Sequence, residues 1–190
     1  MDAFLVPTGI VALAEVGDKT QLLALVLAAR FRRPLPIVMG ILVATLLNHA
    51  LAGAVGQALT TLIGPEALRW CLGISFLLMA GWTLIPDKLD EEETQLKGRW
   101  GVFTATLIAF FIAEMGDKTQ LATVALAAQY ANFLAVVAGT TVGMLLANVP
   151  VVYLGEKAAK AIPLKLVHGL AALLFALLGL MILFRVDRLL

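Results

Sequence analysis

Long apolar runs, separated by clusters of charged residues, proline and glycine, divide the chain into six segments. A helix needs about 20 apolar residues to cross the hydrocarbon core of a bilayer, and each segment is long enough. Only helices and closed barrels satisfy the backbone polar groups in lipid, and these runs lack the alternation of barrel strands. We therefore predict an all-α integral membrane protein with six transmembrane helices, at residues 4–29, 35–58, 67–86, 101–129, 132–154 and 165–185.

Composition agrees with this prediction, since 61% of the 190 residues are hydrophobic and only 14 Lys or Arg and 13 Asp or Glu are present. A soluble domain is about 45–50% apolar with about 25% charged residues, so a soluble protein, a disordered tail and a nucleic-acid binder are excluded. The single cysteine, Cys71, provides no disulfide framework and no thiolate metal site. The N-terminus lacks a basic start and a cleavage site, so we interpret the first segment as a retained span.

Basic residues are divided unequally between the two sides that these spans define. One side receives nine of them: Arg30, Arg32, Arg33, Lys88, Lys97, Arg99, Lys157, Lys160 and Lys165. The other side receives three: Arg69, Arg185 and Arg188. The positive-inside rule then places the first set in the cytoplasm and both termini on the non-cytoplasmic side. The acidic run at 87–93 is either a solvated loop or an entrance that concentrates cations.

The second half of the chain repeats the first at an offset of 99 residues. Residues 15–22 (EVGDKTQL) match residues 114–121 (EMGDKTQL) at seven of eight positions, and Gly40 pairs with Gly139 at the same offset. Each repeat holds three predicted spans. Because three is odd, the second copy must enter the membrane from the opposite side.

The chain is thus predicted to contain two inverted three-helix repeats, residues 1–86 and 100–190, joined by an acidic cytoplasmic connection at 87–99. Inverted repeats are common in secondary transporters, which place their ion site near the membrane midplane at the repeat interface. Duplication can also serve only to build a stable helical bundle, so the repeat alone does not identify a transporter.

Of the 27 charged residues, 21 lie at the ends of the predicted spans or in connections, and six lie inside, all in the repeated motif: Glu15, Asp18, Lys19, Glu114, Asp117 and Lys118. An ionised group at the bilayer centre costs at least about 2.5–3.5 kcal/mol on insertion scales, so these groups need partners. Because positions i, i+3 and i+4 share a helix face, we expect each trio to form one polar patch and the two patches to meet. Gly17 and Gly116 are poor helix formers that permit a kink, whose freed carbonyls could face an ion.

The predicted ligands are almost entirely oxygen atoms. Besides the carboxylates of Glu15, Asp18, Glu114 and Asp117, the motifs and their surroundings supply Thr20, Thr119, Gln21, Gln120, Asn48 and Asn148, and His49 is the one nearby imidazole. Such ligands suit Ca²⁺, Mg²⁺ and Mn²⁺, whereas zinc or copper would call for clustered Cys and His. Four crowded carboxylates cannot all stay ionised once the metal leaves, so protons should replace it. This exchange is the physical basis of metal/proton antiport.

Other interpretations stay open at this point. Lys19 and Lys118 could neutralise the carboxylates in an internal ion-pair network, and Asn48 and Asn148 could serve only as hydrogen-bonding contacts between helices. His49 could be a polar residue that faces the bundle. A passive cation channel, or a regulatory membrane subunit that transports nothing, would fit the same composition. No nucleophile–base pair, HExxH element or phosphate loop is present, so an enzyme is not expected.

The pattern Glu-x-Gly-Asp-Lys-Thr, present once per half, resembles the signature of the GDT family of cation/proton exchangers, which includes Golgi Ca²⁺/Mn²⁺ transporters and bacterial manganese exporters. The resemblance implies an antiporter without a cofactor, which moves Mn²⁺ or Ca²⁺ against H⁺. It also implies that Glu15, Asp18, Glu114 and Asp117 bind the cation and that Lys19, Thr20, Lys118 and Thr119 complete the motifs.

The short chain resembles the compact prokaryotic members of that family, which implies a bacterial inner membrane and favours Mn²⁺ over Ca²⁺. The expected partners are a divalent cation and the lipid bilayer, with no nucleic acid. Whether the chain forms a homo-oligomer stays open.

Overall fold

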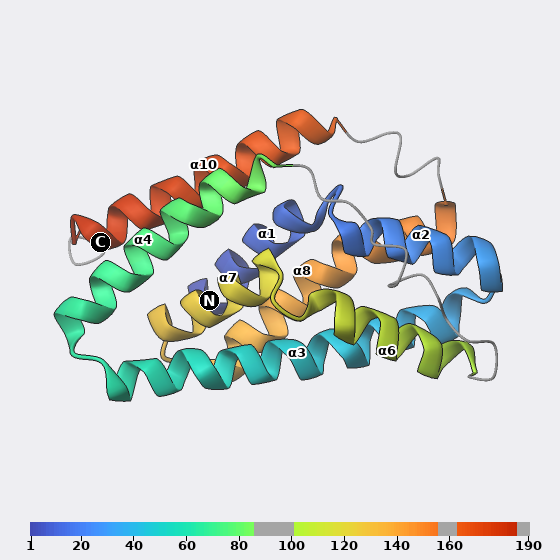
Figure 1. Ribbon diagram of the computed structural model, residues 1–190, viewed down its shortest axis with the longest axis horizontal. Helices are drawn as coiled ribbons and strands as arrows, with labels where there is room; N and C mark the ends of the chain where they lie inside the picture. Colours follow the sequence, from blue (N-terminus) through green and yellow to red (C-terminus); the bar gives the residue numbers. More distant parts are fainter. Residues whose placement is uncertain (86–100, 156–162, 186–190) are drawn as a thin grey trace.

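A computed structural model describes residues 1–85, 101–155 and 163–185, and the secondary structure within these ranges is entirely helical. The helices are α1 (Asp2–Glu15), α2 (Lys19–Phe31), α3 (Pro34–Leu62), α4 (Pro65–Thr83), α6 (Val102–Glu114), α7 (Lys118–Gln129), α8 (Phe133–Leu154) and α10 (Leu164–Leu183), as Figure 1 shows. The prediction of an all-α chain is confirmed. Three of the helices, α3, α8 and α10, are long and apolar enough to cross a membrane, and α6 is a shorter apolar helix.

Several predictions fall outside the described residues. They concern the acidic connection at 87–99 and the basic residues Lys88, Lys97, Arg99, Lys157, Lys160 and Arg188.

Each repeated motif interrupts a predicted span. Helix α1 ends at Glu15 and α2 begins at Lys19, while α6 ends at Glu114 and α7 begins at Lys118. The prediction that each motif lies on the face of one continuous helix is therefore wrong. The reason is the backbone of the two glycines, which has φ +81° at Gly17 and +79° at Gly116, a conformation that ends a right-handed helix and that glycine adopts readily.

Each interrupted span is long enough to cross a bilayer only when both of its half-helices are counted. With 14 residues in α1 and 13 in α2, each half-helix is roughly 20 Å long at 1.5 Å per residue. Neither half alone would cross a hydrocarbon core of about 30 Å, whereas the two halves together have the length of a span. The sharp exit predicted after the first span is present, because α2 ends at Phe31 and Pro34 begins α3.

The two halves of the chain pack against each other through two equivalent contacts. Helix α1 packs along α8, and α6 packs along α3. A Cβ atom on Gly139 of α8 would lie 2.5 Å from the carbonyl oxygen of Phe4, and one on Gly40 of α3 would lie 2.9 Å from that of Phe103. Both members of the first contact are 99 residues from their counterparts in the second. Gly40 therefore lets α3 approach the backbone of α6, and Gly139 lets α8 approach that of α1. Small residues allow the same close approach between membrane helices.

Helices α4 and α10 run side by side as a pair, seen along the upper left of Figure 1. They approach closely at glycines, since a Cβ on Gly179 would lie 2.9 Å from the carbonyl oxygen of Gly73. At one end of the pair, the Glu66 carboxylate accepts hydrogen bonds from Arg69 and from Arg185. The pair contacts the remaining helices mainly through α1 and α7.

We predict that Gly139→Ala destabilises the protein by about 1–3 kcal/mol, because the added methyl group would push α8 away from α1. The measurement is thermal unfolding in detergent. Gly9→Ala on α1 is the matched control, since a Cβ there would meet no atom within 4 Å. Equal unfolding temperatures for both variants would contradict the close approach of α1 and α8.

Candidate cation site

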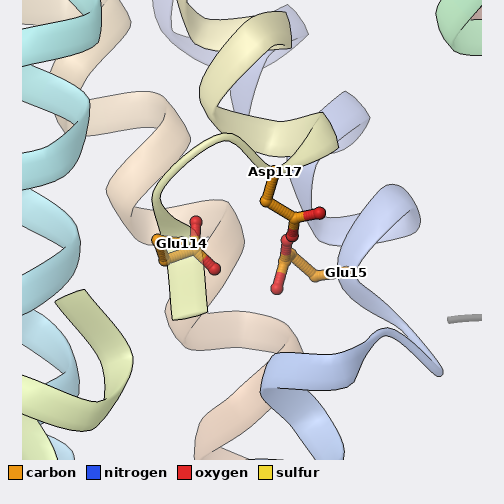
Figure 2. Close-up of side chains that lie close together, drawn as sticks. All are labelled: Glu15, Glu114 and Asp117. Atoms are coloured by element: carbon orange, nitrogen blue, oxygen red, sulfur yellow. The ribbon is translucent and has the colours of Figure 1, made fainter. Parts of the chain in front are cut away.

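Three carboxylates from the two motifs meet in the interior. Glu15 is the last residue of α1, Glu114 is the last residue of α6, and Asp117 directly precedes α7. One oxygen of each lies within 4.8 Å of the others. Figure 2 shows the three side chains pointing toward one another. Glu15 and Glu114 are fully buried and Asp117 is 4% exposed, so this carboxylate cluster (Glu15, Glu114 and Asp117) is shielded from bulk solvent.

Two of the three helix ends at the cluster make it more negative. Glu15 and Glu114 stand at C-termini of half-helices, where the helix dipole places partial negative charge, so the helices themselves do not stabilise these carboxylates. Asp117 occupies the N-cap position of α7, where the dipole favours an anion. A cation between the three groups would compensate both the carboxylates and the two helix C-termini.

Each glutamate is held by a threonine of its own motif. The Thr20 hydroxyl donates to Glu15 Oε2 at 2.5 Å, and the Thr119 hydroxyl donates to Glu114 Oε2 at 3.1 Å. These bonds orient the carboxylates and leave their other oxygens available.

One buried oxygen of each cluster member has no hydrogen-bond partner within the described ranges: Glu15 Oε1, Glu114 Oε1 and Asp117 Oδ2. Buried polar atoms are nearly always paired in folded proteins, so these three oxygens are available to a bound cation. Carboxylate oxygens are the donors that hard divalent cations prefer.

Asp18, the fourth candidate ligand, lies outside this three-residue cluster. Its Oδ1 atom is 3.4 Å from the ammonium nitrogen of Lys118, and both side chains are buried. Lys118 also lies 3.4 Å from the carbonyl oxygen of Ile85, just beyond α4. The structure thus combines both interpretations of the motif charges, with three carboxylates together and an ion pair that joins the two motifs.

The motif glutamines stabilise the helix breaks. The side-chain oxygen of Gln21 accepts from the Gly17 amide at 2.9 Å, and that of Gln120 accepts from the Gly116 amide at 2.7 Å. Gln21 also donates to the carbonyl of Ala147 on α8 at 3.0 Å. These contacts hold the irregular backbone of each motif in place.

The remaining predicted polar residues surround the cluster. Asn48 of α3 donates to the carbonyl of Phe111 on α6 at 3.1 Å, a contact between helices, whereas Asn148 donates to the carbonyl of Met144 on its own helix, α8, at 3.1 Å. His49 is fully buried, with Nε2 3.9 Å from Glu114 Oε2. Lys19 is partly buried and begins α2.

A histidine that the sequence analysis did not consider contacts the first motif. Nε2 of His168, on α10, lies 2.7 Å from the carbonyl oxygen of Val16. The available signal was its place in the predicted span at 165–185, because an ionisable residue within a span points to function by default. The sequence analysis considered only residues that are charged at pH 7, so His168 was not included.

The chain is similar to known divalent-cation transport proteins. The family model described as "Divalent cation/proton antiporter GDT1" matches residues 3–91 and 102–188. A Vibrio cholerae protein named "Putative manganese exporter" is 57% identical over 171 residues, which cover 90% of this chain and 84% of that protein. A GDT1-like protein of Synechocystis is 29% identical, covering 93% of this chain and 94% of the relative. GDT1-like protein 5 of Arabidopsis thaliana is 30% identical, covering 88% and 89%. No solved structure matches the chain.

We predict that Asp117→Asn weakens divalent-cation binding by at least about tenfold, or about 1.4 kcal/mol, because it removes one of the clustered charges. Asp18→Asn should weaken binding less, since Asp18 lies outside the cluster. The measurement is calorimetric titration of the detergent-purified protein with Mn²⁺ and with Ca²⁺.

Asp2→Asn, at the exposed start of α1, is the control for these two variants. Equal losses for Asp18→Asn and Asp117→Asn would show that the two aspartates contribute equally to binding, contrary to the geometry.

Proposed function

Because the chain belongs to the GDT1 family of divalent cation/proton antiporters, we propose that it exports Mn²⁺ from a bacterial cell in exchange for protons, using the carboxylate cluster as its exchange site. Membership of this family makes the chain a membrane transport protein and not an enzyme. The observation that carries the proposal is the cluster itself: three buried carboxylates, each with one oxygen that lacks a hydrogen-bond partner in the described part of the chain.

The cluster supports exchange because its fully ionised state is unstable unless a metal ion or protons are bound. Three carboxylate oxygens within 4.8 Å in a medium of low dielectric constant repel one another strongly when all are ionised. A divalent cation removes this repulsion, and so do protons. One site can therefore hold either ion, and releasing one favours binding of the other.

The choice of Mn²⁺ rests on the relatives rather than on the ligands. Carboxylate oxygens accept Mn²⁺ and Ca²⁺ alike. The 57% identical relative carries the name of a manganese exporter, and we extend that substrate to this chain, with Ca²⁺ as the second candidate.

We further propose that residues 1–86 and 100–190 form two inverted repeats, with both termini on the non-cytoplasmic side. This proposal is supported by the helices that recur at matching positions and by the shared contact at Gly40 and Gly139. The basic cluster at Arg30, Arg32 and Arg33, at the C-terminal end of α2, supports a cytoplasmic end at that point. The likeness to a bacterial relative supports a bacterial inner membrane as the location.

The α4/α10 pair supports alternating access. It packs against α1 and α7, the half-helices that the charge count places on the non-cytoplasmic side of the cluster, and much less against α2 and α6. In an inverted repeat, exchanging the roles of the two halves gives a second state, in which the pair would pack against α2 and α6. We assign the present arrangement to a state with its site closed toward the outside.

We predict that Mn²⁺ added outside proteoliposomes that contain the protein and an internal pH-sensitive dye will make the interior more alkaline. Glu15→Gln and Glu114→Gln should each reduce this signal below about a tenth of its rate, a loss of more than about 1.4 kcal/mol of transition-state stabilisation, because each removes a carboxylate from the cluster. Asp2→Asn should transport at the normal rate.

The same assay separates the rival functions. Uptake of Mn²⁺ without a proton signal would identify a passive channel. The absence of flux for both Mn²⁺ and Ca²⁺ would contradict the antiporter proposal and favour a regulatory subunit. A larger signal with Ca²⁺ than with Mn²⁺ would contradict the assigned substrate alone.

A further inference from the structure

The imidazole ring of His168 is bound to the backbone of the first motif at its break. Its Nε2 atom lies 2.7 Å from the carbonyl oxygen of Val16, the residue between Glu15 and Gly17. A carbonyl oxygen only accepts hydrogen bonds, so Nε2 must carry a proton and donate it to Val16. The bond connects α10 to the junction of α1 and α2, across 152 residues of sequence.

Leu164, one turn before His168 on α10, packs against the same break in the first motif. A Cβ atom on Gly17 would lie 2.7 Å from Leu164 Cδ2 and 3.1 Å from His168 Nε2. The start of α10 is therefore packed directly onto the glycine that breaks the first span.

The second motif has no equivalent cover among the described residues. A Cβ on Gly116 would meet no atom within 4 Å, although its φ of +79° is nearly the same as that of Gly17. At the offset of 98 that pairs Pro65 with Pro163, the counterpart of His168 is Trp70 on α4, which is half exposed. The contact of His168 is thus a property of the first motif and not of both.

The carbonyl of Val16 needs such a partner because the helix leaves it without one. The last carbonyls of a helix have no intrahelical donor, and an unpaired one costs up to about 1–3 kcal/mol where it is buried; the bond to Val16 is partly buried. Without the imidazole, the Val16–Gly17 peptide would be free to turn toward another donor or cation. Because Val16 directly follows Glu15, the orientation of this peptide affects where the Glu15 carboxylate lies relative to Glu114 and Asp117.

We propose that His168 is a positioning residue for the cation site: its hydrogen bond to Val16 holds the α1–α2 break, and so holds Glu15 within the carboxylate cluster. The inference rests on the proposed function of that cluster. His168 itself does not contact the cation; it acts through the backbone of the first motif.

The same bond joins the site to the α4/α10 pair. His168 connects α10 to the first motif, while the Ile85 carbonyl, just beyond α4, is 3.4 Å from Lys118 of the second. Since α4 and α10 pack along each other, a displacement of the pair must alter one or both of these bonds. Movement of the pair is therefore coupled to the geometry of the cluster.

The test compares two substitutions at His168. Gln retains an N–H group that can donate to Val16, whereas Leu has a similar volume and no donor. We expect His168→Leu to raise the KM for Mn²⁺-driven proton movement, and the Kd for Mn²⁺ in calorimetry, by about tenfold (about 1.4 kcal/mol) with a smaller change in kcat. His168→Gln should restore both constants to within about threefold of the original. Leu166→Ala, at an exposed position on the same helix, is the control.

Three results would overturn the inference: unchanged constants in His168→Leu, equal losses in the Leu and Gln variants, or a fall in kcat with unchanged Kd. If His168→Leu is not monodisperse, His168→Phe, which retains a ring and lacks the donor, takes its place. Failure of the original protein to couple Mn²⁺ to protons would contradict the proposed function, whereas the calorimetric Kd values would still test His168.

Discussion

The structure depends on a single electrostatic constraint, which is that three carboxylates are held within 4.8 Å of one another inside an apolar protein. Such an arrangement is stable only if the surrounding groups fix each carboxylate and an ion offsets their repulsion. The threonine hydroxyls, the glutamines that hold the helix breaks and the Asp18–Lys118 ion pair all follow from this requirement. The breaks in the spans also set the charge of the site: the N-terminus of α7 favours the Asp117 carboxylate, while the C-termini of α1 and α6 add partial negative charge that a cation would offset.

The sequence was sufficient for the all-helical architecture and for the approximate limits of the helical segments, because long apolar runs permit little else in lipid. It was not sufficient for the geometry of the motif. Glycine inside an apolar run is compatible both with a continuous helix and with a break, and only the surrounding contacts decide whether Gly17 adopts a positive φ. The prediction that Glu15, Asp18 and Lys19 share one face assumed a continuous helix.

The candidate site shows a second limit of sequence reasoning. Two motifs that differ at one position in eight were expected to contribute equally, yet Asp117 lies in the cluster while Asp18 pairs with Lys118. The two motifs have different surroundings, because α10 packs on the break at Gly17, whereas a Cβ on Gly116 would meet no atom of the described residues within 4 Å. His168 could not be ranked from its position alone, because the carbonyl that it binds is 152 residues away. Asymmetry of this kind belongs to tertiary structure, and a repeat in the sequence conceals it.

The glycine contacts between α1 and α8, and between α6 and α3, have a consequence for how the chain is assembled. In both contacts the first helix of one half packs on the third helix of the other, so neither half contains its own main packing partner. The halves are interlocked in the manner of a domain-swapped dimer whose two copies have become one chain. When only the first half has been synthesised, the face of α1 that packs against α8 is therefore uncovered until α8 has been made. Folding must then wait for nearly the whole polypeptide, and neither repeat is an independent folding unit.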